Sequence, residues 1–364
     1  MKKIISAILV IISIFTLVSC TKYAPQKSTK EESETVLTLT YSGIKYEIPY
    51  EVYRTFFLNR RSEIDGGDLS VWTGEKKAEY IAKIDAVIIP EIAEIYATFH
   101  LCYESGIDIY SKIVEESIED YIAASVEGGA LDGMIIEGYN GDYKAYLERL
   151  KKLNMNYSVQ KLLFRYAVCT ALLNTYYKDK NGEGNTPKFT REDVRAFYES
   201  EETVRVIYNF FDRSTPLNEE INTDARIERM REGLLLRAGD ENAVATYIIS
   251  ETSLTEDVRD GMIISKYSHD TIYYSELVNE ALLLGMHEVS EPIKLTSGAV
   301  EGVYLLYKTD KSSEHFDRCY SDIESAYVSD LIGRRLADIK TALTASTVKS
   351  DALLSRDYSA IGMN

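Results

Sequence analysis

The hydrophobic period of this chain changes near residue 200, and that change limits the folds available to it. Upstream, Ile81, Ile84 and Ile88 open a run of apolar residues, spaced three or four apart, that continues to Cys102 and predicts a long amphipathic helix. Downstream, residues 204–211 form an unbroken run with high β-propensity. Because the two periods occupy separate blocks, we expect an α+β protein with a helical domain and a domain that contains a sheet.

The region before residue 178 is predicted to be almost entirely helical. Three further segments show the helical spacing, at residues 112–124, 142–153 and 158–177. Pro90 lies inside the first helix and predicts a kink or a break there. Ahead of the helices, residues 37–48 alternate well enough for a short hairpin, with Ser42 and Gly43 at its turn.

A boundary is predicted at residues 178–188, which are rich in Lys, Asp, Asn and Gly. Thr190 and Asp193 then form the capping pair of a short helix. After the strand at 204–211 come two segments with helical spacing and a last apolar strand, at residues 223–238, 242–249 and 302–308. Residues 319–343 return to the helical period. This order predicts a compact α+β module at residues 204–308, placed between two helical parts.

The N-terminus resembles a bacterial lipoprotein signal. Lys2 and Lys3 supply its positive charge, residues 4–18 its apolar stretch, and the sequence LVSC ends in Cys20. We expect residues 1–19 to be removed and Cys20 to be acylated, which would anchor the chain to a membrane. The alternative is an uncleaved signal anchor. Residues 20–35 are polar and are expected to form a flexible tether.

Composition narrows the partners and the chemistry. The chain has 58 acidic and 41 basic residues, a net charge of −17, which argues against nucleic acid and anionic lipid surfaces as partners. The four histidines are isolated, so we expect no metal site, and no motif indicates a cofactor. Cys102, Cys169 and Cys319 each fall on a helical apolar stripe and are predicted to be buried thiols; a disulfide or a reactive thiol is the alternative.

Several segments of the module follow the order of landmarks in parvulin-type prolyl isomerases. They are VRVIYNFF, LLLRAG, ATYIISETS, EALLLGMHEVSEPIKL and EGVYLLYK, and the part at residues 287–293 is the most specific. The preceding region, which begins YEIPYEVYRTFF, resembles the N-terminal domain of SurA- and PrsA-type folding factors, particularly lipoprotein versions from Gram-positive bacteria. The chain is therefore similar to extracytoplasmic foldase lipoproteins over nearly all of its mature length.

The resemblance implies a domain plan. A SurA-like helical chaperone domain would be built from N- and C-terminal segments, with a parvulin-like (FKBP-like) α+β domain inserted. The expected boundaries are residues 36–200 for the helical domain, 201–311 for the parvulin-like domain and 312–364 for a C-terminal helix that returns to the helical domain.

The resemblance also implies a site. Prolyl isomerisation breaks no bond, so such a site needs an apolar cup and donors that favour the twisted amide over either planar form. Parvulins build the floor of this cup with two histidines and a cysteine or aspartate. Those positions fall here on Tyr208, Tyr304 and Thr252. The apolar wall, which would contact the substrate, falls near three residues, Ile264, Tyr273 and Leu277.

Tyrosine keeps the floor aromatic and polar-tipped, but it lacks a group that titrates near neutrality. We therefore expect weak isomerase activity or none. Three hypotheses stay open: a lipid-anchored foldase on the bacterial cell surface, a chaperone of the same architecture without turnover, and a surface interaction lipoprotein that reuses the scaffold. In the first two, the partners are unfolded or newly exported polypeptides, with the membrane contacted through the lipid anchor.

Overall fold

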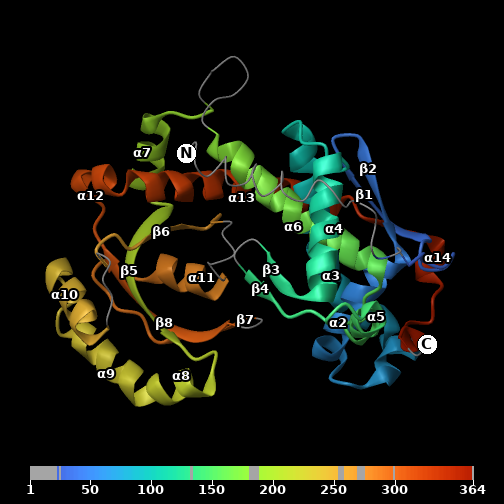
Figure 1. Ribbon diagram of the computed structural model, residues 1–364, viewed down its shortest axis with the longest axis horizontal. Helices are drawn as coiled ribbons and strands as arrows, with labels where there is room; N and C mark the ends of the chain where they lie inside the picture. The colour runs from blue at the N-terminus through green and yellow to red at the C-terminus, as the bar shows by residue number, and fades with distance from the viewer. Residues whose placement is uncertain are drawn as a thin grey trace. The chain divides into compact units, whose positions relative to one another are not determined.

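The computed structural model divides the chain into two compact units (Figure 1). It describes Tyr23 and residues 26–131, 134–179, 188–252, 258–268, 275–297 and 300–362. The helical unit comprises Met1–Leu173 and Leu336–Asn364, and the sheet unit comprises Asn174–Arg335. Helices predominate in the first, and a four-stranded antiparallel sheet with helices on it makes up most of the second, so the predicted α+β class is confirmed.

The helical unit contains long helices and a small sheet. Its helices are α2 (Tyr50–Asp65), α3 (Lys77–Glu104), α4 (Lys112–Glu127), α5 (Tyr143–Lys152), most of α6 (Tyr157–Lys178), the end of α13 (Tyr320–Ala345) and α14 (Asp351–Leu354). Short 3₁₀ turns are η1 (Leu69–Trp72), η2 (Gly74–Lys76) and η4 (Tyr358–Ala360). Its strands are β1 (Thr35–Tyr41), β2 (Ile44–Pro49) and β9 (Val348–Lys349), in the order β2-β1-β9, and the pair β3 (Gly129–Leu131) and β4 (Met134–Ile136).

The predicted hairpin and long helix are both present. Strands β1 and β2 pair around Ser42 and Gly43, which have φ values of 49° and 80°, as a tight hairpin turn requires. Helix α3 continues through Pro90, so the chain does not break there, and a kink at Pro90 stays a prediction. The stretch Gly74–Glu104 is long and apolar enough to cross a membrane by length and composition, but 67% of its apolar window is buried in the protein. That burial is typical of a core helix.

The two ends of the chain complete one core in the helical unit. Strand β9 pairs with β1, and the ring of Tyr358 stacks on Trp72 at 6.4 Å and meets Phe57 edge-on at 5.8 Å. The Trp72 indole Nε1 donates to Asp65 Oδ2 at 2.7 Å, which satisfies its buried donor. The C-terminal segment is therefore part of the helical unit rather than an appendage.

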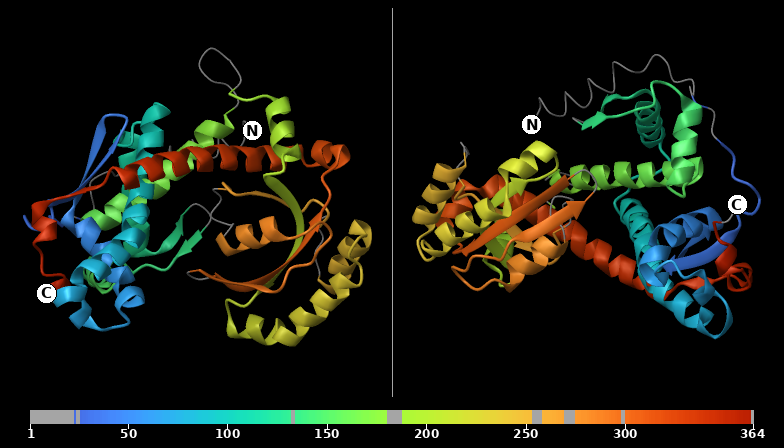
Figure 2. Two further views of the ribbon diagram at one scale, coloured as in Figure 1. Left: turned by 180° about the vertical axis from the view of Figure 1, so that it is seen from behind. Right: turned by 90° about the horizontal axis from the view of Figure 1, so that it is seen from below.

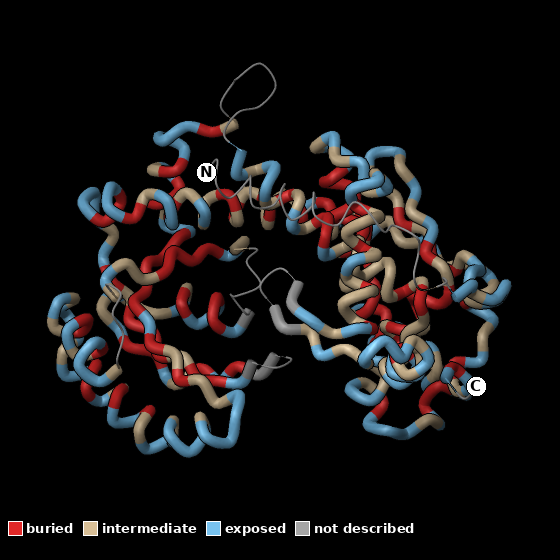
Figure 3. Tube along the Cα trace, in the orientation of Figure 1, coloured by how far each residue is buried: buried red, intermediate tan, exposed pale blue. Residues whose placement is uncertain are grey.

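The sheet unit places four antiparallel strands between helices. Its strands are β5 (Thr203–Asp212), β6 (Met262–Ser265), β7 (Ile293–Ser297) and β8 (Val300–Thr309), in the order β6-β5-β8-β7. Its helices are α7 (Arg191–Glu199), α8 (Pro216–Ile221), α9 (Asp224–Leu235), α10 (Glu241–Glu251), α11 (Ser275–Leu283), α12 (Ser313–Arg318) and the first part of α13. Figures 2 and 3 show α11 on one face of the sheet, α9 and α10 on the other, and buried residues along the strands.

The sheet unit extends beyond the 201–311 expected for the parvulin-like domain. Thr190 and Asp193 form the predicted capping box of α7. The aromatic face of that helix then packs within the same unit: Phe197 lies 5.5 Å from Tyr327, and the Tyr198 ring stacks on His315 at 5.7 Å. These contacts join α7 to α12 and to the first part of α13, so the three helices lie in the same unit as the sheet, and the bounds 201–311 stay a prediction for the parvulin-like domain.

Other predictions concern the cysteines and the tether. Cys102 and Cys169 have no exposed surface and Cys319 is buried, as predicted. Cys20 and residues 180–187 lie outside the described residues. Residues 26–34, expected to belong to a tether, instead contact the helical unit: the Tyr50 amide donates to the Glu34 carbonyl at 2.8 Å.

Removal of the Tyr358 ring should destabilise the helical unit. Tyr358→Ala leaves a cavity beside Trp72 and is expected to cost about 3–5 kcal/mol. Urea unfolding followed by fluorescence measures this, because Trp72 is the single tryptophan of the chain. Tyr103→Ala is the control, since that ring is 67% exposed. Equal midpoints for the two variants would contradict a core role for the C-terminal segment.

Candidate functional site

The first and last strands of the sheet unit lie side by side at its centre. Strand β5 pairs antiparallel with β8 from Arg205 opposite Thr309 to Asp212 opposite Gly302. Along this ladder Phe210 lies directly opposite Tyr304, and Tyr208 lies opposite Leu306. The strands predicted at residues 204–211 and 302–308 are therefore direct neighbours, and the register decides which side chains meet.

The two faces of the sheet carry different side chains, because successive residues of a strand point to opposite faces. One face packs against α9 and α10 through Ile207, Phe211 and Leu305. The other packs against α11 through Val204, Val206 and Leu306. By this alternation Tyr208 and Phe210 belong to the α11 face, and Tyr304 packs against the core of that face.

Three aromatic rings gather on the α11 face. The Tyr208 and Tyr304 centroids are 5.9 Å apart with an interplanar angle of 37°, and the Phe210 and Tyr304 centroids are 4.6 Å apart. We call Tyr208, Phe210 and Tyr304 the aromatic cluster. Tyr208 is 37% exposed, whereas the other two rings are half-buried. Tyr208 is thus the most exposed ring of the cluster, and it lies beside the half-buried rings of Phe210 and Tyr304.

Gly302 makes room for this cluster. A Cβ at Gly302 would lie 2.2 Å from Phe210 Cε2 and 2.8 Å from the Phe211 carbonyl oxygen, so any side chain would displace the ring or the strand. Phe210 was not among the site residues predicted from the sequence. Because it lies two residues after Tyr208, the alternation of a strand places it on the same face.

Thr252, predicted as a third hydroxyl of the site, ends α10. Its hydroxyl donates to the Ile248 carbonyl at 2.7 Å, within its own helix. Helix α10 packs on the face opposite the aromatic cluster through Val244 and Ile248. The structure therefore brings Tyr208 and Tyr304 together and places Thr252 at a helix end, where its role remains a prediction.

The expected apolar wall is mostly core. Ile264 on β6 and Leu277 on α11 have no exposed surface and pack together in the core of the α11 face. In this arrangement they support the sheet, and contact with a peptide would require their exposure. Tyr273 lies outside the described residues.

An ion pair fixes strand β5 from the other face. The buried Arg205 guanidinium donates to both carboxylate oxygens of Glu241, at 2.9 and 2.7 Å, and the Thr309 hydroxyl donates to the same carboxylate at 2.7 Å. Burial alone would raise the pKa of Glu241, but these hydrogen bonds outweigh it and leave that pKa below the usual 4.5. The pair joins β5, β8 and α10, and Arg205 lies three positions before Tyr208 on β5.

Two histidines of the sheet unit have other partners. His287 Nδ1 lies 3.1 Å from the hydroxyl of Tyr307, which packs on the α9 and α10 face. His315 is buried, with Nδ1 3.0 Å from the Tyr198 hydroxyl and Nε2 2.9 Å from the Asp260 carbonyl oxygen. Neither imidazole belongs to the aromatic cluster, and His269 lies outside the described residues.

No protein-family model matches the chain, and no curated protein matches it. Its structural neighbours are foldase structures. The foldase protein PrsA from Streptococcus pneumoniae is 14% identical, with 78% of this chain and 93% of that chain covered and a TM-score of 0.28. PrsA from Lactococcus lactis is 9% identical (90% and 99% covered, TM-score 0.24), and PrsA from Bacillus subtilis is 12% identical (92% and 99%, TM-score 0.24). These low TM-scores carry no weight in assigning the function.

Gly302→Ala should disturb the aromatic cluster. The added methyl group displaces Phe210, and we expect a loss of about 1–3 kcal/mol, as for other overpacked sites. Hydrogen exchange of the β5 and β8 amides measures the loss. In the background of Phe210→Ala the same substitution should cost less, because the ring is gone and only the Phe211 carbonyl oxygen, 2.8 Å from the new Cβ, still has to shift. An equal cost in both backgrounds would contradict the packing described.

The Arg205–Glu241 pair should make the sheet unit sensitive to acid. Because the pKa of Glu241 is lowered on folding, its carboxylate stabilises the native state above pH 4.5, and this contribution is lost as the pH falls below that value. Glu241→Gln should cost roughly 1–3 kcal/mol at pH 7 and give a shallower decline between pH 5 and pH 3. Protection from amide hydrogen exchange, measured at each pH, follows the stability. Glu251→Gln, at an exposed position of the same helix, is the control. Parallel pH profiles for all three proteins would refute the assignment.

Proposed function

We propose that this chain is an extracytoplasmic protein-folding factor that binds unfolded polypeptide at the aromatic cluster and isomerises prolyl bonds weakly. The observation that carries the proposal is the adjacency of Tyr208 and Tyr304 across the β5–β8 ladder, with Tyr208 accessible. These are the two positions at which the parvulin resemblance expects the floor of a proline-binding cup.

The chemistry of the cluster favours binding over turnover. Aromatic rings offer a flat apolar surface to a proline ring, and a phenol hydroxyl is both a donor and an acceptor for a peptide amide. Catalysis requires that the twisted amide be held better than the planar one. The aromatic cluster supplies few hydrogen-bond donors that could favour the twisted amide over the planar one, so we expect slow isomerisation.

A chaperone without turnover is the second candidate. The full burial of Ile264 and Leu277 favours it, because an isomerase cup needs an open apolar wall and these residues belong to the core. Suppression of aggregation of an unfolded client, without any change in its proline exchange rate, would distinguish this candidate. A surface interaction lipoprotein on the same scaffold would show neither effect.

We also propose that the chain is a lipid-anchored protein of the bacterial cell surface. The support is the signal-like sequence that ends at Cys20, a part of the chain outside the described residues. Loss of acylation in Cys20→Ser, detected as loss of membrane fractionation and of the lipid mass, tests it.

The proposal predicts slow catalysis that depends on Tyr208. NMR measures the exchange between the cis and trans forms of short Xaa-Pro peptides, and the intact chain should accelerate it weakly. The acceleration by Tyr208→Ala should be about tenfold smaller, a loss of about 1.4 kcal/mol in transition-state binding. Tyr176→Ala is the matched control, because both rings are 37% exposed and both lie in the sheet unit.

Two outcomes would count against this assignment. Equal rates for Tyr208→Ala and Tyr176→Ala would remove the aromatic cluster as the site. A second arm restores imidazoles with Tyr208→His and Tyr304→His together, and exchange should then accelerate if the tyrosines limit turnover. Failure of that arm, with the intact chain also inactive but still able to bind the peptide, would favour the chaperone without turnover.

A further inference from the structure

An N-terminal segment lies against the helical unit without secondary structure of its own. We call Tyr23 and residues 26–29 the strap. The Tyr23 ring lies against the Tyr143 ring, with centroids 5.1 Å apart and the planes tilted by 31°, and its hydroxyl donates to Glu127 Oε1 at 2.9 Å. Further on, the hydroxyl oxygens of Ser28 and Ser158 are 2.8 Å apart. The strap is thus held by contacts to α4, α5 and α6 of the same unit.

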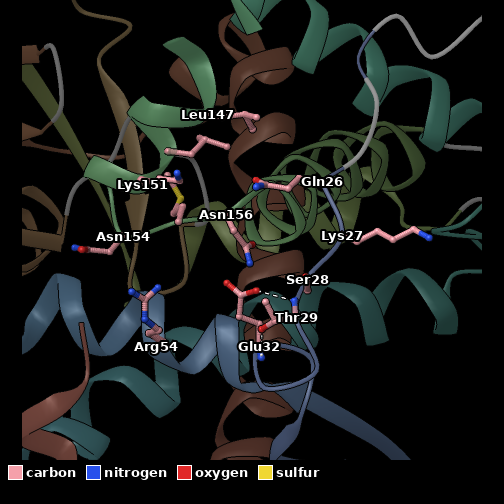
Figure 4. Close-up of a pocket in the computed structure, with 12 residues that line it drawn as sticks. Gln26, Lys27, Ser28, Thr29, Glu32, Arg54, Leu147, Lys151, Asn154 and Asn156 are labelled. Carbon is pink, nitrogen blue, oxygen red and sulfur yellow. Dashed lines mark hydrogen bonds between the residues drawn. The ribbon is translucent and has the colours of Figure 1, made fainter. Parts of the chain in front are cut away.

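Two cavities flank the strap. The first, of about 340 Å³, lies between the strap, α2 and the loop after α5, and Figure 4 shows its lining residues. The second, of about 350 Å³, is lined from α2, α3 and α6 and by the residue that ends β2. Gln26 lines both cavities, so the strap passes between them. The Asn156 amide of the first cavity also donates to Glu51 Oε2 of the second at 2.7 Å.

The lining of the two cavities suits an extended polypeptide. Apolar side chains line both: Leu147 and Met155 in the first, Val52 and Leu162 in the second. Polar side chains stand around them, and several bond within the protein: the Asn154 amide donates to Asn59 Oδ1 at 2.8 Å and the Asn156 amide to Glu51 Oε2 at 2.7 Å. A bound peptide would exchange such bonds for its own amides and carbonyls, and the phenols of Tyr96 and Tyr157 line the second cavity.

One cation of the first cavity is available to a bound chain. The Arg54 side chain is half-buried and, within the described part of the molecule, makes no hydrogen bond or ion pair. Glu32 of the same cavity is satisfied by the Thr29 amide at 2.7 Å and remains an acceptor beside it. An extended polypeptide with a carboxylate among apolar residues would use both the guanidinium and the apolar lining.

We propose that these two cavities are the halves of a polypeptide-binding groove, and that the strap occupies its middle and must leave before an unfolded client binds along its whole length. The strap is itself an extended polypeptide held there by an aromatic side chain and a serine hydroxyl, the kinds of contact a client would make. This inference rests on the proposed function and adds to it a second binding surface with a built-in competitor.

The contacts of the strap are suited to displacement. The Tyr23–Glu127 hydrogen bond is exposed and the Ser28–Ser158 hydrogen bond is only partly buried. A segment held in this way competes with a client by lowering the fraction of groove that is open, and the apparent affinity for the client falls by the same factor. Any change that fixes the strap should therefore weaken client binding, and any change that loosens it should strengthen binding.

A reversible cross-link tests the proposal. Ser28→Cys together with Ser158→Cys places two thiols where hydroxyl oxygens now lie 2.8 Å apart, which suits a disulfide. The full chain, reconstituted in lipid nanodiscs, is titrated with fluorescently labelled, reduced and carboxymethylated lactalbumin, a permanently unfolded probe. The oxidised variant should bind the probe on the order of tenfold more weakly than the same variant after reduction. Each single serine-to-cysteine variant should be insensitive to reduction.

A second variant keeps the test decisive if the disulfide does not form. Tyr23→Ser removes the ring that contacts Tyr143 and should raise the affinity for the probe, whereas Lys30→Ser, at an exposed position outside the strap, should leave it unchanged. Equal affinities in the oxidised and reduced states, or no gain in Tyr23→Ser, would overturn the strap while leaving client binding intact. Absence of binding by every protein, the intact chain included, would instead overturn the proposed function.

Discussion

The antiparallel ladder between β5 and β8 is the interaction on which the sheet unit depends. Its partners are about 100 residues apart in sequence, from Arg205 opposite Thr309 to Asp212 opposite Gly302, and all of α8 to α11 lies within that interval. A shift of one residue would move Tyr208 to the face of α9 and α10 and carry Arg205 away from Glu241. The ladder therefore sets the aromatic cluster and its structural support at the same time.

The sequence predicts the two strands of this ladder, because both are apolar and contain β-branched and aromatic residues, but it does not predict their register. Local signals also predicted the Ser42–Gly43 hairpin and the Thr190–Asp193 capping box, since each depends on neighbouring residues only. The full burial of Ile264 and Leu277 could not be predicted, because strand β6 has only four residues and its burial depends on how α11 covers the sheet. The packing of Phe210 could not be predicted either, because its ring fills the space over Gly302, a residue of the opposite strand.

The helical unit poses a different constraint, because its core closes only when both ends of the chain are present. Strand β1 pairs with β9 across about 310 residues of sequence, and Trp72 packs against Tyr358 across about 290. Closing so long a loop costs entropy before any contact compensates for it, although that cost grows slowly with length. The inserted sheet unit has a core of its own, so its folding can shorten the effective loop before the ends meet.

Residues 26–34, which follow the signal-like sequence, are polar and nevertheless contact the helical unit. A segment rich in Lys, Ser and Glu buries too little apolar surface to fold alone, which is why a tether was expected at residues 20–35. Such a segment can still be ordered when the groups it needs come from a folded neighbour. Here Arg356, whose guanidinium pairs with Glu31 and Glu34, and Ser158, which meets Ser28, supply them. The composition shows that this segment cannot fold alone, and the contacts with Arg356 and Ser158 order it.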